Sequence, residues 1–86
     1  MNGLVHARAS IDAQLVTYRA ERGPVTVEQV DADLCEDERT VMFTAHLSDG
    51  NAVAASVDLP KRVDPGQFDP EAWRDAMRDC PPTTVH

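Results

Sequence analysis

The residues whose types and spacing could do chemistry are five carboxylates near the middle of the chain. Asp31 and Asp33 alternate with apolar residues, and Glu36, Asp37 and Glu38 follow closely. On a strand, two aspartates separated by one residue share a face about 7 Å apart. We call these five residues the acidic row. It predicts a surface that grips a Lys- and Arg-rich partner, directly or by imitating a nucleic-acid backbone.

The acidic row also has a purely structural interpretation. Charged side chains on an edge strand prevent that strand from pairing with another sheet. A calcium site is not favoured, because calcium loops need ligands in a fixed order together with a glycine, and this run lacks both features.

The cysteines and histidines show no metal-binding or catalytic spacing. Cys35 and Cys80 form no C-x-x-C pair, and two free thiols are favoured over a disulfide. His6, His46 and His86 are dispersed, whereas zinc ligands usually come in closely spaced pairs. We therefore expect no metal and no cofactor.

Tyr18, His46 and Asp58 are residue types that could transfer protons. Catalysis needs a nucleophile with a base, or two carboxylates with separated pKa values in a cleft. No motif joins these three residues, and a chain of 86 residues has only a small core. We therefore expect a protein that is not an enzyme and has no catalytic residues.

The overall charge narrows the functions further. Fifteen acidic residues against eight basic ones give a formal net charge of −7. This charge opposes direct binding to nucleic-acid phosphates and suits a basic protein partner, although a GC-rich genome could explain the composition alone. No apolar run approaches the ~20 residues of a membrane span, and there is no signal peptide. We expect one small cytoplasmic domain over residues 1–86, without a membrane partner.

The elements that must position these residues are organised around a β-hairpin. Apolar residues alternate along Val41–Leu47 and again along Val53–Leu59, and turn-forming residues separate the two runs. Both apolar sets can face one core only if the numbers of paired residues have an even sum. This predicts a three-residue loop, with Gly50 or Asn51 left-handed, instead of a two-residue turn.

A third strand is expected before the hairpin. Val25–Cys35 is compatible with a strand or with a helix that has Thr26 in a capping box. The strand is favoured because it joins matched faces across a tight acidic turn. The expected pairs are Leu34 with Val41, Ala32 with Phe43, and Val30 with Ala45.

Two helices complete the expected fold. Residues 9–22 predict a helix because Ile11, Leu15 and Tyr18 fall on one face, and a strand over residues 11–19 is the alternative. The C-terminal helix begins at Pro70, after a cap at Asp69.

Phe68 and Trp73 are spaced as a hydrophobic staple around the start of the C-terminal helix. Trp73 and Met77 would pack that helix on the sheet. The fold class is α+β: a three-stranded antiparallel meander with an N-terminal and a C-terminal helix packed on it. Residues 1–8 and 81–86 are expected to be flexible tails.

One stretch suggests a different function. Arg22–Leu47, RGPVTVEQVDADLCEDERTVMFTAHL, resembles the helix–turn–helix of winged-helix DNA-binding proteins. Arg39-Thr40-Val41 would open the recognition helix, and the hairpin would be the wing. The resemblance implies a DNA-binding transcriptional regulator. The chain departs from that family because Val41–Leu47 carries no Lys or Arg and alternates as a strand.

The favoured interpretation is a small acidic module that binds protein and acts as an inhibitor or regulator. In size and charge it is similar to anti-defence inhibitors of phages, which occupy the basic groove of a nucleic-acid-handling complex. The second face of the hairpin carries Met42, Ala52 and Ala54. Such an apolar face predicts that the sheet is covered on both sides, or that two copies form a homodimer through it.

Overall fold

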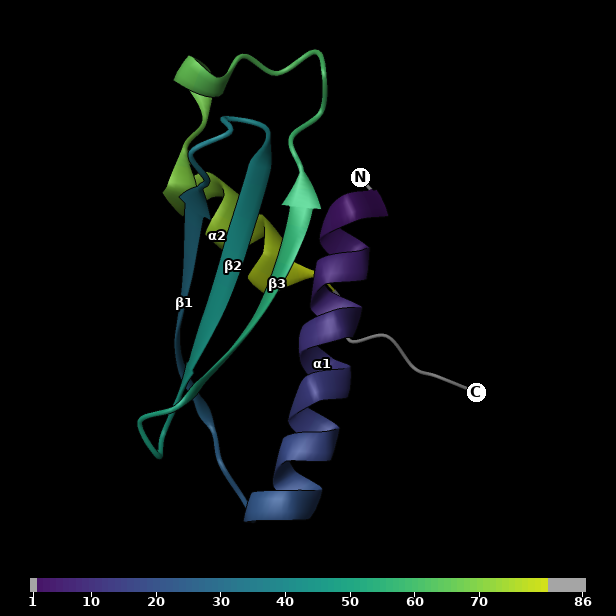
Figure 1. Ribbon diagram of the computed structural model, residues 1–86, viewed down its shortest axis with the longest axis vertical. Coiled ribbons are helices and arrows are strands. Elements are labelled where there is room, and N and C mark those ends of the chain that lie inside the picture. The colour runs from purple at the N-terminus through teal and green to yellow at the C-terminus, as the bar shows by residue number, and fades with distance from the viewer. Residues whose placement is uncertain (1, 81–86) are drawn as a thin grey trace.

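The computed structural model describes residues 2–80 and has the predicted α+β order of elements (Figure 1). One sheet contains three antiparallel strands in the order β1-β2-β3, with a helix at each end of the chain. The elements are α1 (Asn2–Arg22), β1 (Val27–Leu34), β2 (Thr40–Leu47), β3 (Ala52–Asp58), the 3-10 helix η1 (Pro65–Gln67) and α2 (Pro70–Asp79).

The strand registers confirm the argument from alternation. Leu34 lies opposite Val41, Ala32 opposite Phe43 and Val30 opposite Ala45. In the hairpin, the Leu47 N–H donates to the Asn51 carbonyl, so three residues form the loop, and Gly50 has a φ of 91°. The odd-numbered residues of β2 therefore share one face, and all four of them are buried: Val41, Phe43, Ala45 and Leu47.

Helix α1 is longer than the helix predicted over residues 9–22. It begins at Asn2, so residues 2–8 are helical and the expected frayed end is wrong there. Leu4 and Ala7 continue the apolar stripe into the core, and a Cβ placed on Gly3 would lie 3.5 Å from the Cβ of Val57. The strand alternative for residues 11–19 is also wrong. The expected tail at 81–86 lies outside the described residues.

Helix α2 has the predicted start. The carboxylate of Asp69 accepts a 3.1 Å hydrogen bond from the Glu71 N–H, and Pro70 follows the cap. The rings of Phe68 and Trp73 lie 5.6 Å apart between centroids, which forms the staple. Met77 is buried and packs the helix against the sheet, while Trp73 is half-buried.

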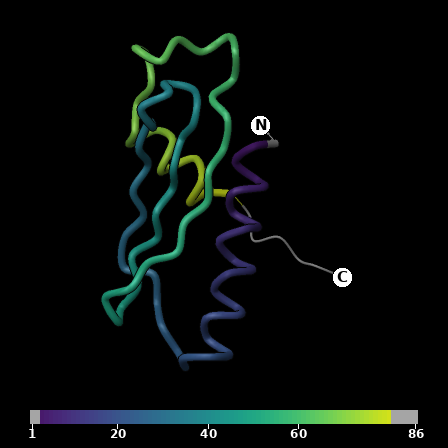
Figure 2. Tube along the Cα trace, viewed as in Figure 1, coloured from purple at the N-terminus to yellow at the C-terminus, as the bar shows by residue number. Residues whose placement is uncertain are grey.

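Both helices contribute to a core on the odd-numbered face of β2. Helix α1 runs beside β3 and α2 crosses behind the sheet near β1 (Figures 1 and 2). On the other face, Ala52 and Ala54 are exposed and Met42 is half-buried, so no described element covers the sheet there. We call this the open face. Within residues 2–80, no helix has the length and apolar character to cross a membrane.

Candidate functional site

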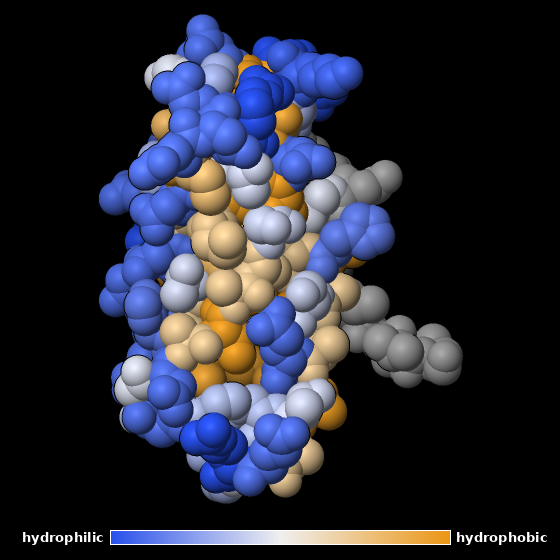
Figure 3. Space-filling view, viewed as in Figure 1, coloured by the Kyte–Doolittle hydropathy of each residue, from blue (hydrophilic) through white to orange (hydrophobic). Residues whose placement is uncertain are grey.

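The acidic row lies on β1 and on the turn that joins β1 to β2. Asp31 and Asp33 are on the side of β1 that belongs to the open face, opposite Thr44 and Met42. Glu36, Asp37 and Glu38 follow in the turn. Because β1 is an outer strand of the sheet, all five carboxylates lie along one edge. Figure 3 shows hydrophilic side chains along that side of the open face.

Asp37 has a structural role within the row. One carboxylate oxygen accepts 2.9 Å hydrogen bonds from the N–H groups of Arg39 and Thr40, and the other accepts one of 2.7 Å from the Thr40 hydroxyl. Glu38 adopts a left-handed φ of 57° inside the same turn. The Arg39 N–H and then the Thr40 hydroxyl lower the pKa of Asp37. The Asp37 carboxylate is therefore occupied by hydrogen bonds that hold the turn, which makes it less available to a partner than a free carboxylate.

Asp31 is also engaged within the chain. It accepts a 2.7 Å hydrogen bond from Gln29 and lies 2.8 Å from Nε2 of His46 on β2. The hydrogen bond from Gln29, followed by that from His46, lowers the pKa of Asp31. His46 thus faces solvent beside an aspartate and extends the polar end of the open face.

The other three carboxylates of the row are free. Asp33, Glu36 and Glu38 are exposed, and their side chains make no hydrogen bond or ion pair with residues 2–80. Their negative charge is not neutralised by the described residues. The part of the row best suited to an external partner is therefore these three residues.

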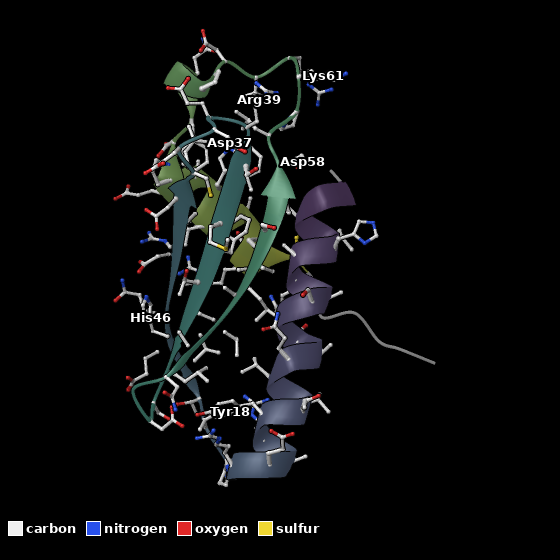
Figure 4. The ribbon with its side chains drawn as sticks, in the orientation of Figure 1. Tyr18, Asp37, Arg39, His46, Asp58 and Lys61 are labelled. Atoms are coloured by element: carbon white, nitrogen blue, oxygen red, sulfur yellow. The ribbon has the colours of Figure 1, made fainter. Side chains whose placement is uncertain are left out.

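The structure does not assemble the catalytic candidates (Figure 4). The Tyr18 hydroxyl bonds with Asp49 in the hairpin loop, and it accepts a 2.7 Å hydrogen bond from the Asn51 amide. Asp58 lies opposite Thr40, six residues along β2 from His46, which corresponds to about 20 Å. The three side chains therefore serve three separate parts of the surface.

The possible metal ligands are equally separate. Cys35 and Cys80 are free, half-buried thiols. In the part of the chain from residue 2 to residue 80, no group of three His, Cys, Asp or Glu side chains is arranged to hold a metal ion.

The winged-helix interpretation loses its structural basis. Val41–Leu47, which would be the recognition helix, lies in β2, and the preceding segment forms β1. The segment is a strand because its apolar residues alternate and pair with β1 and β3 on both sides. There is therefore no helix–turn–helix between Arg22 and Leu47.

A groove between the helices was not predicted. It has a volume of about 540 Å³ and is bordered by four arginines, Arg8, Arg19, Arg74 and Arg78. The arginines come from α1 and α2, which are distant in sequence. The Arg8–Asp12 pair and the Arg78–Asp75 pair have recognisable helical spacings. Because the same lining includes only two carboxylates, those of Asp12 and Glu28, positive charge predominates in this groove.

Two of these arginines, Arg8 and Arg19, connect different segments of the fold. Arg8 donates 3.0 Å hydrogen bonds to the carbonyls of Arg78 and Cys80, which links α1 to the end of α2. Arg19 donates to the Val25 carbonyl at 3.1 Å, and Arg78 donates to Asp75 at 3.0 Å. Arg8 and Arg19 thus join separate segments along this groove, whereas Arg78 pairs within α2.

The open face provides apolar surface beside the acidic row. Ala54 lies in the same cross-strand row as Thr44 and Asp31, and Met42 lies next to Asp33. An apolar band follows the middle of this face, with hydrophilic side chains on its β1 side (Figure 3). An apolar centre with a polar rim is the usual anatomy of a protein–protein interface.

Comparisons with known proteins do not assign a role to this surface. No protein-family model, no curated protein and no solved structure matches the chain. Its function is therefore argued from its own geometry and charge.

Proposed function

We propose that this protein is a non-enzymatic interaction module that binds a basic, nucleic-acid-handling protein and inhibits or regulates it. The observation that carries the proposal is the position of the free carboxylates of Asp33, Glu36 and Glu38 beside the apolar band of the open face. Lys and Arg side chains of the partner would meet the carboxylates. Met42, Ala52 and Ala54 would supply the apolar contact.

Charge supports this choice of partner. With a net charge of −7, the protein attracts a basic surface over a distance comparable to the Debye length, about 8 Å at physiological ionic strength. Such steering raises the association rate more than it slows dissociation. The acidic row would occupy the site that the partner offers to a phosphate backbone, as a nucleic-acid mimic does. We place the interaction in the cytoplasm, where thiols such as Cys35 and Cys80 stay reduced.

The test compares two variants of equal net charge. Asp33→Asn with Glu36→Gln removes two free carboxylates of the row, and Glu21→Gln with Asp79→Asn removes two exposed carboxylates on the helices. The partner is captured from the native host on the immobilised wild type, purified, and its association rate with each protein measured. We expect the row variant to associate about 10-fold more slowly, the helix variant to match the wild type, and added salt to weaken wild-type binding.

The same measurement can contradict the proposal. Equal slowing by both variants would show that only net charge matters. Unchanged rates for both variants would show that the acidic row is not part of the interface.

A further inference from the structure

The two outer edges of the sheet are treated differently by the rest of the chain. On β3, the Ala54 carbonyl accepts a 2.7 Å hydrogen bond from the Gln14 side chain of α1. Helix α1 runs along that edge (Figure 1). On β1, no hydrogen bond from residues 2–80 reaches the outward backbone groups. The outer edge at β3 therefore has a helix beside it and accepts a hydrogen bond from that helix. At the other outer edge, the outward backbone groups of β1 are unpaired within residues 2–80.

The unpaired groups of β1 follow from the strand register. The Cys35 N–H donates a 2.8 Å hydrogen bond to the Thr40 carbonyl. In an antiparallel pair, bonded and unbonded positions alternate along the strand. The N–H and C=O groups of Val30, Ala32 and Leu34 therefore point away from β2. A row of such groups is a template for another strand.

The side chains around this edge define what strand it would accept. Asp31 and Asp33 flank the edge on the open face. Beside β1, a slot of about 230 Å³ is lined by Ala32 and Pro70 together with four charged residues, Asp31, Asp33, Glu71 and Arg74. An added strand would place alternate side chains beside the aspartates and beside Ala32, because successive residues point to opposite faces of the sheet.

We propose that β1 accepts an extended segment of a basic partner as a fourth strand of the sheet. This inference rests on the proposed function and specifies its mode of binding. The segment alternates Lys or Arg, which pair with Asp31 and Asp33, with small apolar residues, which lie beside Ala32 on the helical face of the sheet. A second copy of β1 is disfavoured as occupant, because it would bring like charges into opposition across the new strand pair.

The test uses three synthetic peptides of the same sequence and charge. The first is acetyl-Lys-Val-Lys-Val-Lys-Val-Lys amide, the second has N-methyl groups on its valines, and the third has them on its lysines. An antiparallel strand directs its valine N–H groups toward β1, whereas a parallel strand directs its lysine N–H groups there. We expect one methylated peptide to bind at least 10-fold more weakly than the unmodified peptide, and the other to bind like it.

Amide hydrogen exchange shows where on the protein the peptide binds. The amides of Val30, Ala32 and Leu34 should exchange rapidly in the free protein and become protected when the unmodified peptide binds. Asp33→Asn should weaken that binding, whereas Asp58→Asn, an exposed aspartate on β3, should leave it unchanged.

The failures of the two proposals are distinguishable. Equal affinity for all three peptides, without protection of the β1 amides, would overturn strand addition and leave an acidic surface that binds basic partners. Failure of the unmodified peptide to bind at low salt would also overturn strand addition, and the charge-matched variants described above would then judge the proposed function separately.

Discussion

The side-chain amide of Gln14 in α1 donates a 2.7 Å hydrogen bond to the backbone carbonyl of Ala54 in β3. This contact joins residues that are far apart in sequence and satisfies an outward-pointing group of an outer strand. Helix α1 therefore both fills the core and donates a hydrogen bond to the outer edge of β3. It also explains why the sheet needs protection by charge at β1 and less so at β3, since only β3 has a helix beside its edge.

Replacing Gln14 should therefore loosen the outer edge of β3. Gln14→Met keeps the length and helix propensity of the side chain but removes the donor. We expect a loss of about 0.5–1 kcal/mol in the free energy of unfolding, because the bond is exposed and water partly replaces it. Urea denaturation measures this loss. Gln67→Met, at an exposed glutamine outside α1, is the control, and an equal loss there would contradict the role of Gln14.

The two faces of β2 should respond differently to truncation. Phe43 is 0% exposed in the centre of the core, so Phe43→Ala should cost about 3–5 kcal/mol. That approaches the whole stability of a domain this small, so Phe43→Leu, which removes less of the buried side chain and should cost less, keeps the effect measurable. Thr44→Ala, on the open face, should cost less than Phe43→Leu. Urea denaturation monitored by circular dichroism measures the loss in the free energy of unfolding for each variant. Equal losses for Phe43→Leu and Thr44→Ala would contradict the assignment of the two faces.

The hairpin was predictable because its information is local. The alternation of Phe43 and Ala45 with the polar residues Thr44 and His46, and the turn chemistry at Gly50, determine the strand period and the loop length. The start of α1 was not predictable in the same way. Leu4 and Ala7 continue the stripe, but their helical state depends on packing against β3, close to Val57.

The candidate site was predictable only in part. The location of the acidic row on a strand and its turn follows from local pattern, and the structure confirms the strand. The partners of individual carboxylates do not follow from it. Asp31 meets His46 only because β1 pairs with β2 in one register, and Asp37 is used by the turn itself. The arginine-lined groove depends on helices at opposite ends of the chain.

Stability should decrease in acid because three aspartates accept hydrogen bonds in the folded protein. Hydrogen bonds hold the pKa values of Asp31, Asp37 and Asp49 below the ordinary 3.8; the first donors are Gln29, Arg39 and Tyr18, respectively. A carboxylate with a lowered native pKa binds protons less readily than in the unfolded chain. Its contribution to stability is therefore complete above the unfolded pKa and is lost as the pH falls through the native value.

The urea concentration at which half of the protein is unfolded should then stay nearly constant from about pH 7 to pH 5. It should decrease when the pH is lowered below about 4. Asp37→Asn should make this fall less steep, since its side chain no longer titrates. Ser56→Ala, an exposed change on β3, should keep the wild-type profile. A wild-type midpoint that rises as the pH drops from 5 to 3 would contradict the assignment.

Duplex DNA separates the proposed function from a DNA-binding regulator. The segment that would be a recognition helix is β2, and the protein carries a net charge of −7. Protein–DNA affinity rises as salt falls, because bound cations are released from the phosphates. Low salt is therefore the most permissive condition, and we expect no change in the anisotropy of a labelled duplex at protein concentrations up to about 50 μM, a range that covers typical non-specific affinities. A dissociation constant in the micromolar range or tighter would rule out the acidic-module function, and the Asp33→Asn, Glu36→Gln variant would then bind DNA more tightly than the wild type.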